Sequence, residues 1–322
     1  MARVFLHIGL NKTGTSSIQD ILYHNYDFLR SKGVLYPKTW FKDGGHHELV
    51  PLARRSKQEI LADARFRDLE EEIGDAETVI MSSEPLWNLT GLEHIRTALG
   101  HHDVRAVIYL RHHLPHLLSW YQQNVQAAIQ TADPLDFVHF QRFSYVKILT
   151  WLAERFGRDK LEIRVYDRAR LKDGDSVADF FDVCGIPMYE ELQRKPWEQN
   201  PSITGNLLFF KRVMNFVVDR EETEMFVDEM TDLAKLDETF TGGLVIPGED
   251  LRHWNNIFAH DVRRVRENFG IDMGPQLQKL KGHPSPDWSR WERDFEMIVE
   301  GARARDFKVL SVLPRMRRLA GC

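Results

Sequence analysis

The chain has 322 residues, of which 43% are hydrophobic and 28% are charged, a balance typical of a folded protein with a substantial core. At this length we expect one large domain or one domain with a sizeable extension. The formal net charge of -5 argues against general nucleic-acid binding, which usually depends on a basic surface, but it still allows a local basic pocket for a small anion.

Cysteine content argues against a protein held together by disulfides or zinc, and hydropathy argues against a membrane-spanning protein. The two cysteines, Cys184 and Cys322, are too few for a disulfide framework or a cysteine-based zinc site. No apolar run reaches membrane-spanning length, and Met1 leads almost directly into the first predicted strand without a signal peptide. The sequence therefore predicts a cytoplasmic protein without an integral membrane segment.

The first predicted element is a strand at residues 3–8 (RVFLHI), followed by the loop GLNKTGTSS at residues 9–17. Apolar residues then recur at helical spacing, which predicts a helix; they are Ile18, Ile21, Leu22, Phe28 and Leu29. A strand, a loop of small residues and a helix form an anion-binding site, because loop N–H groups and the helix N-terminus point to one place. Lys12 adds a cation. In the alternative interpretation the loop is a plain turn, with Thr15 or Ser17 as the helix N-cap.

The next elements alternate between strands and helices. Predicted strands lie at residues 33–37, 77–81, 104–110 and 161–166, and predicted helices at 48–73, 114–129, 143–156 and 176–184. This alternation predicts an α/β fold of three layers, a parallel sheet flanked by helices. Because parallel sheets bind ligands at the carboxyl ends of their strands, we expect the loop at 9–17, the Ser82–Glu84 segment and Arg111 to converge on one crevice.

Beyond residue 190 the pattern becomes helical. Predicted helices lie at residues 206–218, 225–236, 251–269 and 288–302, and no clear strand interrupts them. We expect a single domain over residues 1–322, with an α/β core at 1–190 that carries the anion-binding loop and a mostly helical extension at 191–322.

The segment His7–Ser17, HIGLNKTGTSS, closely resembles the 5′-phosphosulfate-binding loop of sulfotransferases that use 3′-phosphoadenosine-5′-phosphosulfate (PAPS). It departs from the nucleotide-triphosphate loop G-x-x-x-x-G-K-S/T, because Lys12 precedes Gly14. The resemblance implies a P-loop-like fold and a loop that cradles the 5′-phosphate, with the lysine also reaching the bridging oxygen of the sulfate ester. The residues that would hold this group are Lys12, Thr13, Gly14, Thr15, Ser16 and Ser17.

A second segment, RAVIYLRHHLPHLLSWY at residues 105–121, carries Arg111 at a strand end and Ser119 two turns into the next helix. PAPS-dependent sulfotransferases bind the 3′-phosphate of the nucleotide with an arginine and a serine at this separation. Alternatively, Arg111 pairs with a carboxylate and Ser119 faces solvent. Weaker resemblances to the family lie at residues 82–84, 164–167 and 200–202.

Transfer of a sulfuryl group to a hydroxyl requires a base that removes the acceptor proton. Glu84 is the first candidate, because it follows a strand that ends at the same crevice, and carbohydrate sulfotransferases of this superfamily often use a glutamate in a comparable position. Glu84 can alternatively cap the following turn or anchor Lys12. His46 and His47, in a Gly-Gly-His-His-Glu loop, are the rival bases, although a solvent-exposed histidine pair is the commoner arrangement.

Together these motifs predict a PAPS-dependent sulfotransferase of bacterial type that needs no metal. It would sulfate a hydroxyl or amine of a carbohydrate, lipid or small-molecule acceptor, and would release 3′-phosphoadenosine 5′-phosphate. The resemblance implies that the core at 1–190 binds the nucleotide and that the helical extension at 191–322 shapes the acceptor site. The alternatives are a P-loop kinase or NTPase with a degenerate phosphate loop, or a nucleotide-binding protein without turnover.

Overall fold

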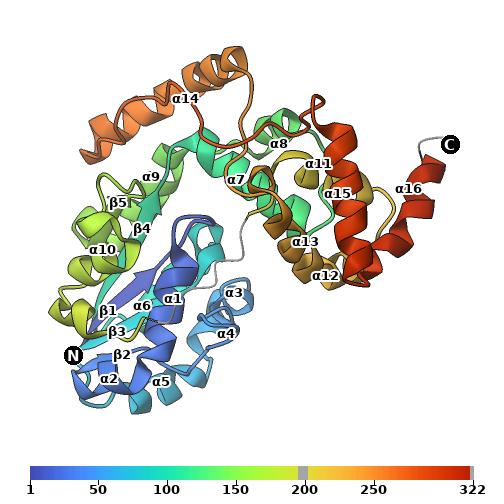
Figure 1. Cartoon of the computed structure of the whole chain (residues 1–322). Helices are drawn as coiled ribbons and strands as arrows, with labels where there is room; N and C mark the ends of the chain where they lie inside the picture. Colours follow the sequence, from blue (N-terminus) through green and yellow to red (C-terminus); the bar gives the residue numbers. More distant parts are fainter. Residues whose placement is uncertain (195–201, 320–322) are drawn as a thin grey trace. The chain divides into compact units, whose positions relative to one another are not determined.

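The computed structural model describes residues 1–194 and 202–319, and contains one sheet of five parallel strands (Figure 1). The strand order is β2-β3-β1-β4-β5. The strands are β1 (Arg3–His7), β2 (Val34–Leu35), β3 (Thr78–Ser82), β4 (Asp103–Leu110) and β5 (Leu161–Val165). The predicted α/β class and parallel sheet are therefore confirmed.

The centre of the sheet positions the site. His7 at the end of β1 is in register with Ser82 of β3 on one side and with Val107 of β4 on the other. From β1 the chain continues to β2 at one edge, whereas from β4 it continues to β5 at the other edge. The connections therefore diverge between β1 and β4, and open α/β sheets bind their ligands at such a switch point, outside the carboxyl ends of the strands.

Helices pack against this sheet and against each other. Helices α1 and α10 are in contact. With Phe5, Val107 and Tyr109 of the sheet, their apolar residues form one buried cluster. Helix α9 packs against β4 and β5. The helices of this part are α1 (Thr15–His24), α2 (Tyr26–Ser31), α3 (Leu49–Leu52), α4 (Lys57–Leu61), α5 (Arg65–Ile73), α6 (Leu92–Ala98), α9 (Tyr145–Phe156) and α10 (Ser176–Val183).

The predicted helix at residues 48–73 is three short helices, α3, α4 and α5. Ser56 explains one of the breaks, because its side chain accepts a hydrogen bond from the Glu59 N–H while the Glu59 side chain accepts one from the Ser56 N–H. This capping box starts a new helix at Lys57. Charge and apolar spacing alone did not reveal this start signal.

Contacts within the chain define two compact units. The first comprises Met1–Arg111, Ser144–Trp197 and Asp261–Met273, and the second comprises His112–Phe143, Glu198–His260 and Gly274–Cys322. The first unit contains the sheet. Residues 112–143, which precede the predicted extension, group with the second unit. The single-domain description and the boundary at residue 190 stay predictions.

The second unit is built of helices, and its described residues form isolated β-bridges but no named strand. Apolar residues of helix α7 from Leu114 to Val125 lie in the core of this unit, whereas Ile129, the last residue of the helix predicted at 114–129, lies beyond α7 and is 46% exposed. Its helices are α7 (His113–Ala127), α8 (Pro134–Gln141), α11 (Gly205–Met214), α12 (Arg220–Met225), α13 (Val227–Leu233), α15 (Trp291–Ala304) and α16 (Leu313–Leu319), while α14 (Gly248–Phe269) contributes to both units.

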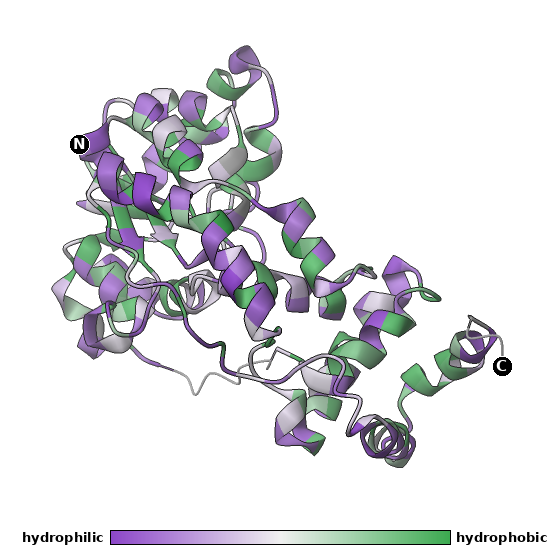
Figure 2. Ribbon diagram, turned by 90° about the horizontal axis from the view of Figure 1, so that it is seen from above, coloured by the Kyte–Doolittle hydropathy of each residue, from purple (hydrophilic) through white to green (hydrophobic). Residues whose placement is uncertain are grey.

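Several helices show one polar and one apolar face along their length (Figure 2). In the described part of the chain, no helix is long and apolar enough to cross a bilayer.

Residues 195–201 and 320–322 lie outside the described residues. The predicted family resemblance at residues 200–202 therefore falls mostly outside the described residues, and Cys322 lies outside them as well.

Candidate anion-binding and active site

The loop between β1 and α1 has an unusual backbone that its sequence explains. Lys12 and Gly14 adopt left-handed conformations, with φ of 65° and 84°. The Thr13 hydroxyl donates to the Leu10 carbonyl at 2.6 Å and closes the turn. A Cβ on Gly14 would lie 2.8 Å from both Ser176 Oγ and Tyr166 Cε2, so this position needs glycine for its conformation and for space.

Helix α1 begins without a side-chain cap. Gly14 occupies the N-cap position and makes no side-chain hydrogen bond to the first turn. Neither Thr15 nor Ser17 is the N-cap, so the cap residues expected in the alternative interpretation are wrong. Thr15 is 1% exposed, and its hydroxyl makes no well-formed hydrogen bond within the described residues. A helix N-terminus without a side-chain cap is suited to binding an anion, because the N–H groups of its first turn have no intrahelical acceptors.

Arg111 reaches this loop from the end of β4. Its Nη1 donates to the Lys12 carbonyl at 3.1 Å, and its guanidinium lies over the Tyr166 ring, 5.9 Å from the centroid. The Tyr145 hydroxyl donates to the Arg111 carbonyl at 2.6 Å and lies 3.2 Å from the Arg111 N–H. The backbone of Arg111 is therefore held by a helix that follows 34 residues later in the chain.

The electrostatics of Lys12 and Arg111 favour an anion. Burial lowers the pKa of Arg111, while Tyr166 and Tyr145 act in the opposite direction. Burial also lowers the pKa of Lys12, Glu84 opposes this effect, and the Arg111 charge adds to it. In the part of the chain that the structure describes, neither cation forms an ion pair with a carboxylate. A bound anion would compensate the charges of Lys12 and Arg111 for their partial loss of water and would reduce the repulsion between them.

Glu84 follows the end of β3 and opens a short 3-10 helix, Glu84–Asn88. Burial raises the pKa of Glu84, whereas the nearby Lys12 ammonium and Thr15 hydroxyl lower it. Glu84 is therefore close enough to Lys12 for the two charges to affect each other, in agreement with their positions at the ends of neighbouring strands. A carboxyl group whose pKa is raised by burial is a stronger base when it is ionised.

The two histidines of the loop at 42–47 have different environments. His46 is completely buried, so the expected exposed histidine pair is wrong for this residue. Both its ring nitrogens already contact the backbone, Nε2 the Pro37 carbonyl and Nδ1 the Ser82 N–H, which leaves none for acid–base chemistry. His47 is half-buried, and its Nδ1 lies 3.1 Å from Ser83 Oγ. Burial lowers the pKa of His47, and Asp43 opposes this shift.

Ser119 lies in the second turn of α7, in the helical unit, and is half-buried. Its joint role with Arg111 in binding a 3′-phosphate stays a prediction. The contacts that Tyr145, Tyr166 and Ser176 make with Arg111 and the loop were not predicted from the sequence. Tyr166 lies in the segment at 164–167 that weakly resembles the family, whereas no local pattern connects Tyr145 or Ser176 with the loop.

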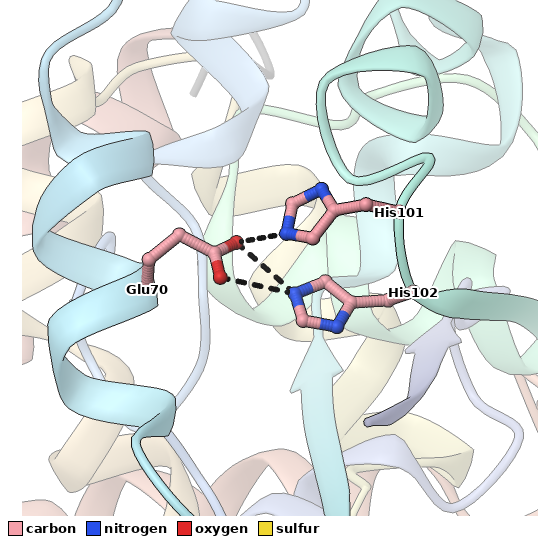
Figure 3. Close-up of side chains that lie close together, drawn as sticks. All are labelled: Glu70, His101 and His102. Atoms are coloured by element: carbon pink, nitrogen blue, oxygen red, sulfur yellow. Dashed lines mark hydrogen bonds and ion pairs between the residues drawn. The ribbon is translucent and has the colours of Figure 1, made fainter. Parts of the chain in front are cut away.

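A second polar cluster joins α5 to the segment before β4 (Figure 3). His101 Nε2 lies 2.9 Å from Glu70 Oε1, and His102 Nε2 lies 3.0 Å from the same oxygen. Burial acts to raise the pKa of Glu70, but hydrogen bonds from the two histidines outweigh it and hold this pKa below its usual value.

The cluster has ligand types that zinc uses, yet the hydrogen bonding of His102 opposes a metal. The Ala2 N–H donates to His102 Nδ1 at 3.1 Å, which places the ring proton on Nε2, the atom that faces Glu70. A metal-bound histidine normally shows the reverse arrangement, with the other ring nitrogen donating to an acceptor. We therefore interpret the cluster as a hydrogen-bonded link between α5 and the amino end of the sheet.

Comparisons with known proteins give limited matches. No family model matches the chain. An uncharacterized protein of Archaeoglobus fulgidus is 30% identical over 129 residues, which is 39% of this chain and 35% of that protein, so the match spans about a third of the relative's length. Among solved structures, one described as a sulfotransferase from Alicyclobacillus acidocaldarius aligns with a TM-score of 0.44 and 14% identity, covering 83% of this chain and 96% of that one.

Proposed function

We propose that this protein is a PAPS-dependent sulfotransferase, which transfers a sulfuryl group to a hydroxyl or amine of a carbohydrate, lipid or small-molecule acceptor. The observation that carries the proposal is the pair of partly buried cations, Lys12 and Arg111, beside the uncapped N-terminus of α1. The resemblance of residues 7–17 to the phosphosulfate-binding loop supports it.

The residues present fit the phosphate groups of this nucleotide. The N–H groups at the start of α1, the Thr15 hydroxyl and the Lys12 ammonium would bind the 5′-phosphosulfate, with hydroxyls of Thr13, Ser16 and Ser17 nearby in the sequence. PAPS supplies an activated sulfuryl group when bound. Lys12 would stabilise the negative charge that develops on the leaving phosphate oxygen, an effect of the size of one oxyanion-hole donor, roughly 3–4 kcal/mol.

Arg111 would bind the 3′-phosphate with Ser119. The guanidinium is oriented by its hydrogen bond to Lys12 O and by the Tyr166 ring, so little rotational freedom would be lost on binding. A bisphosphorylated nucleotide would thus contact one cation at each of its two phosphate positions.

Glu84 would take the proton from the acceptor as the new S–O or S–N bond forms. The pKa of Glu84, raised by burial, increases the basicity of its carboxylate, while the Lys12 ammonium acts in the opposite direction and favours the ionised form. His47 is the alternative base, because its ring lies next to Ser83 and has a nitrogen available beyond Nδ1. His46 is excluded by its two backbone contacts.

Calorimetric titration with 3′-phosphoadenosine 5′-phosphate, compared with ATP plus Mg²⁺, tests this proposal on the wild type and on Arg111→Ala. We expect metal-free binding of the bisphosphate, weakened roughly 10- to 100-fold by the substitution, as for the loss of a charge-assisted hydrogen bond. Arg67→Ala is the matched control, because Arg67 is an exposed arginine on α5. Preference for ATP with Mg²⁺ would instead favour a P-loop kinase or NTPase.

A further inference from the structure

The edge of β3 next to the site lacks a neighbouring strand. Strand β2 pairs only with Thr78 and Val79, whereas β3 continues to Ser82. The Ser83 N–H turns toward β1 and donates to the His7 carbonyl at 3.1 Å. In a strand, the backbone N–H and carbonyl groups of consecutive residues point to opposite sides. Because the Ser83 N–H points toward β1, the N–H and carbonyl of Ser82 point toward the open edge. Both groups are buried and would be costly without partners.

His46 supplies both partners. Its backbone N–H donates to the Ser82 carbonyl at 2.7 Å, and its ring Nδ1 accepts from the Ser82 N–H at 3.1 Å. The imidazole nitrogen therefore replaces the carbonyl oxygen of a missing strand. Because Nδ1 is an acceptor, the ring proton lies on Nε2, which donates to the Pro37 carbonyl at 2.9 Å.

The surroundings of His46 leave this arrangement little freedom. The Tyr36 ring packs edge-on against the imidazole, with centroids 4.7 Å apart. A Cβ on Gly45 would lie 2.5 Å from Gln19 Nε2 and 2.9 Å from the Ser82 carbonyl oxygen. Gln19 in turn donates to Ser82 Oγ at 3.1 Å. The loop thus fits closely against the end of β3 and depends on glycine at position 45.

The residues that follow are the two candidate bases. His47 comes directly after His46 and contacts Ser83 Oγ, and Glu84 comes directly after Ser83. We propose that His46 is a positioning residue, which completes the edge of β3 and thereby holds His47 and Glu84 in place at the anion site. The catalytic importance of this position rests on the proposed sulfotransferase function, whereas the positioning itself does not.

The test compares His46→Phe, which fills the space without hydrogen bonding, with His46→Asn, whose side-chain oxygen can accept from the Ser82 N–H. The readouts are amide hydrogen exchange at Ser82 and the NMR titration of the His47 ring. We expect His46→Phe to accelerate exchange at Ser82 and to move the His47 titration toward that of an ordinary exposed histidine. His46→Asn should largely restore the slow amide exchange at Ser82 and the wild-type titration of His47. The control is His24→Asn, a change at an exposed histidine of α1.

Unchanged Ser82 exchange and unchanged His47 titration in His46→Phe would overturn the proposal. If that variant does not fold, Gly45→Ala replaces it, because its methyl group would push the same loop away from the Ser82 carbonyl, and the same shifts are expected. Titration of each variant with 3′-phosphoadenosine 5′-phosphate should show retained affinity, since His46 does not contact Lys12 or Arg111. Failure of the wild type to bind it would count against the sulfotransferase function alone.

Discussion

Partly or fully buried cations occur in both units, and their surroundings differ. In the first unit, the partly buried Lys12 and Arg111 lie beside the uncapped N-terminus of α1. In the second unit, Lys211 of α11 is completely buried, donates to Asn215 Oδ1, and has its pKa lowered by burial to about 7. Asn215 also donates to the carbonyls of Val125, Ala128 and Gln130.

The comparison shows that burial of a cation does not by itself indicate a binding site. Desolvation lowers the pKa of the amine in Lys12 and in Lys211 alike. Lys12 lies near other hydrogen-bond donors that could bind an anion, namely the first N–H groups of α1. Lys211 instead donates to the side chain of Asn215, which itself donates to backbone carbonyls. The first arrangement favours a ligand, and the second favours a structural role, which the following experiments can separate.

The largest effect is expected for Lys12→Ala. Loss of the cation beside the leaving phosphate should reduce turnover by about 10²- to 10³-fold, the usual cost of one donor that stabilises developing charge. Production of 3′-phosphoadenosine 5′-phosphate from PAPS, measured with a panel of hydroxyl acceptors, is the assay. Lys57→Ala changes an exposed lysine of α4 and should leave the rate unchanged. Equal rates in Lys12→Ala and wild type would exclude the assigned role.

Glu84→Gln should lower turnover by about 10²-fold or more, as for the loss of a general base, with nucleotide affinity retained. In the wild type, turnover should rise with pH as the Glu84 carboxyl group ionises, and burial places this rise above the usual range of a glutamate. Loss of the pH-dependent rise in Glu84→Gln would confirm the assignment. If the rise persists there and disappears in His47→Asn, His47 is the base.

Lys211→Met should stabilise the protein, because a buried amine is replaced by an apolar side chain of similar length. In the wild type, the unfolded chain holds the Lys211 proton up to about pH 10, whereas the folded protein releases it near pH 7. The unfolded state therefore binds more protons in this window, so stability should rise with pH there, by on the order of a few kcal/mol.

Urea unfolding between pH 7 and pH 10 measures this dependence. The curve for Lys211→Met should be flatter than that of the wild type, while Lys279→Met, a change at an exposed lysine, should follow the wild type. If the free energy of unfolding of Lys211→Met still depends steeply on pH, groups other than Lys211 cause the dependence.

The smallest effect is expected at the Glu70 cluster. His101 is 57% exposed, so its hydrogen bond to Glu70 should contribute less than about 1 kcal/mol, and His101→Ala should change the melting temperature little. Because the Ala2 N–H fixes the His102 tautomer, added Zn²⁺ should not raise the melting temperature of wild type above that of Glu70→Gln. A zinc-dependent increase confined to wild type would show a metal site.

Much of the fold was predictable because its signals are local. Apolar runs of strand length separated by helical periods indicated a parallel sheet, and the glycine-rich loop after the first strand indicated where an anion would bind. Parallel strands place their carboxyl ends at one edge of the sheet, so residues 9–17, Glu84 and Arg111 could be assigned to one region before their contacts were known.

The remaining features depended on contacts between residues distant in the chain. The Tyr145 hydroxyl holds the backbone of Arg111, and His46 completes the edge of β3, because the tertiary structure brings these groups together. No periodicity or spacing in the sequence encodes such pairs. The sequence by itself therefore determined the order of strands and helices and the chemistry of the loop. Only the tertiary structure decided which polar groups were satisfied by the protein and which remained available for a ligand, because that depends on long-range packing and burial.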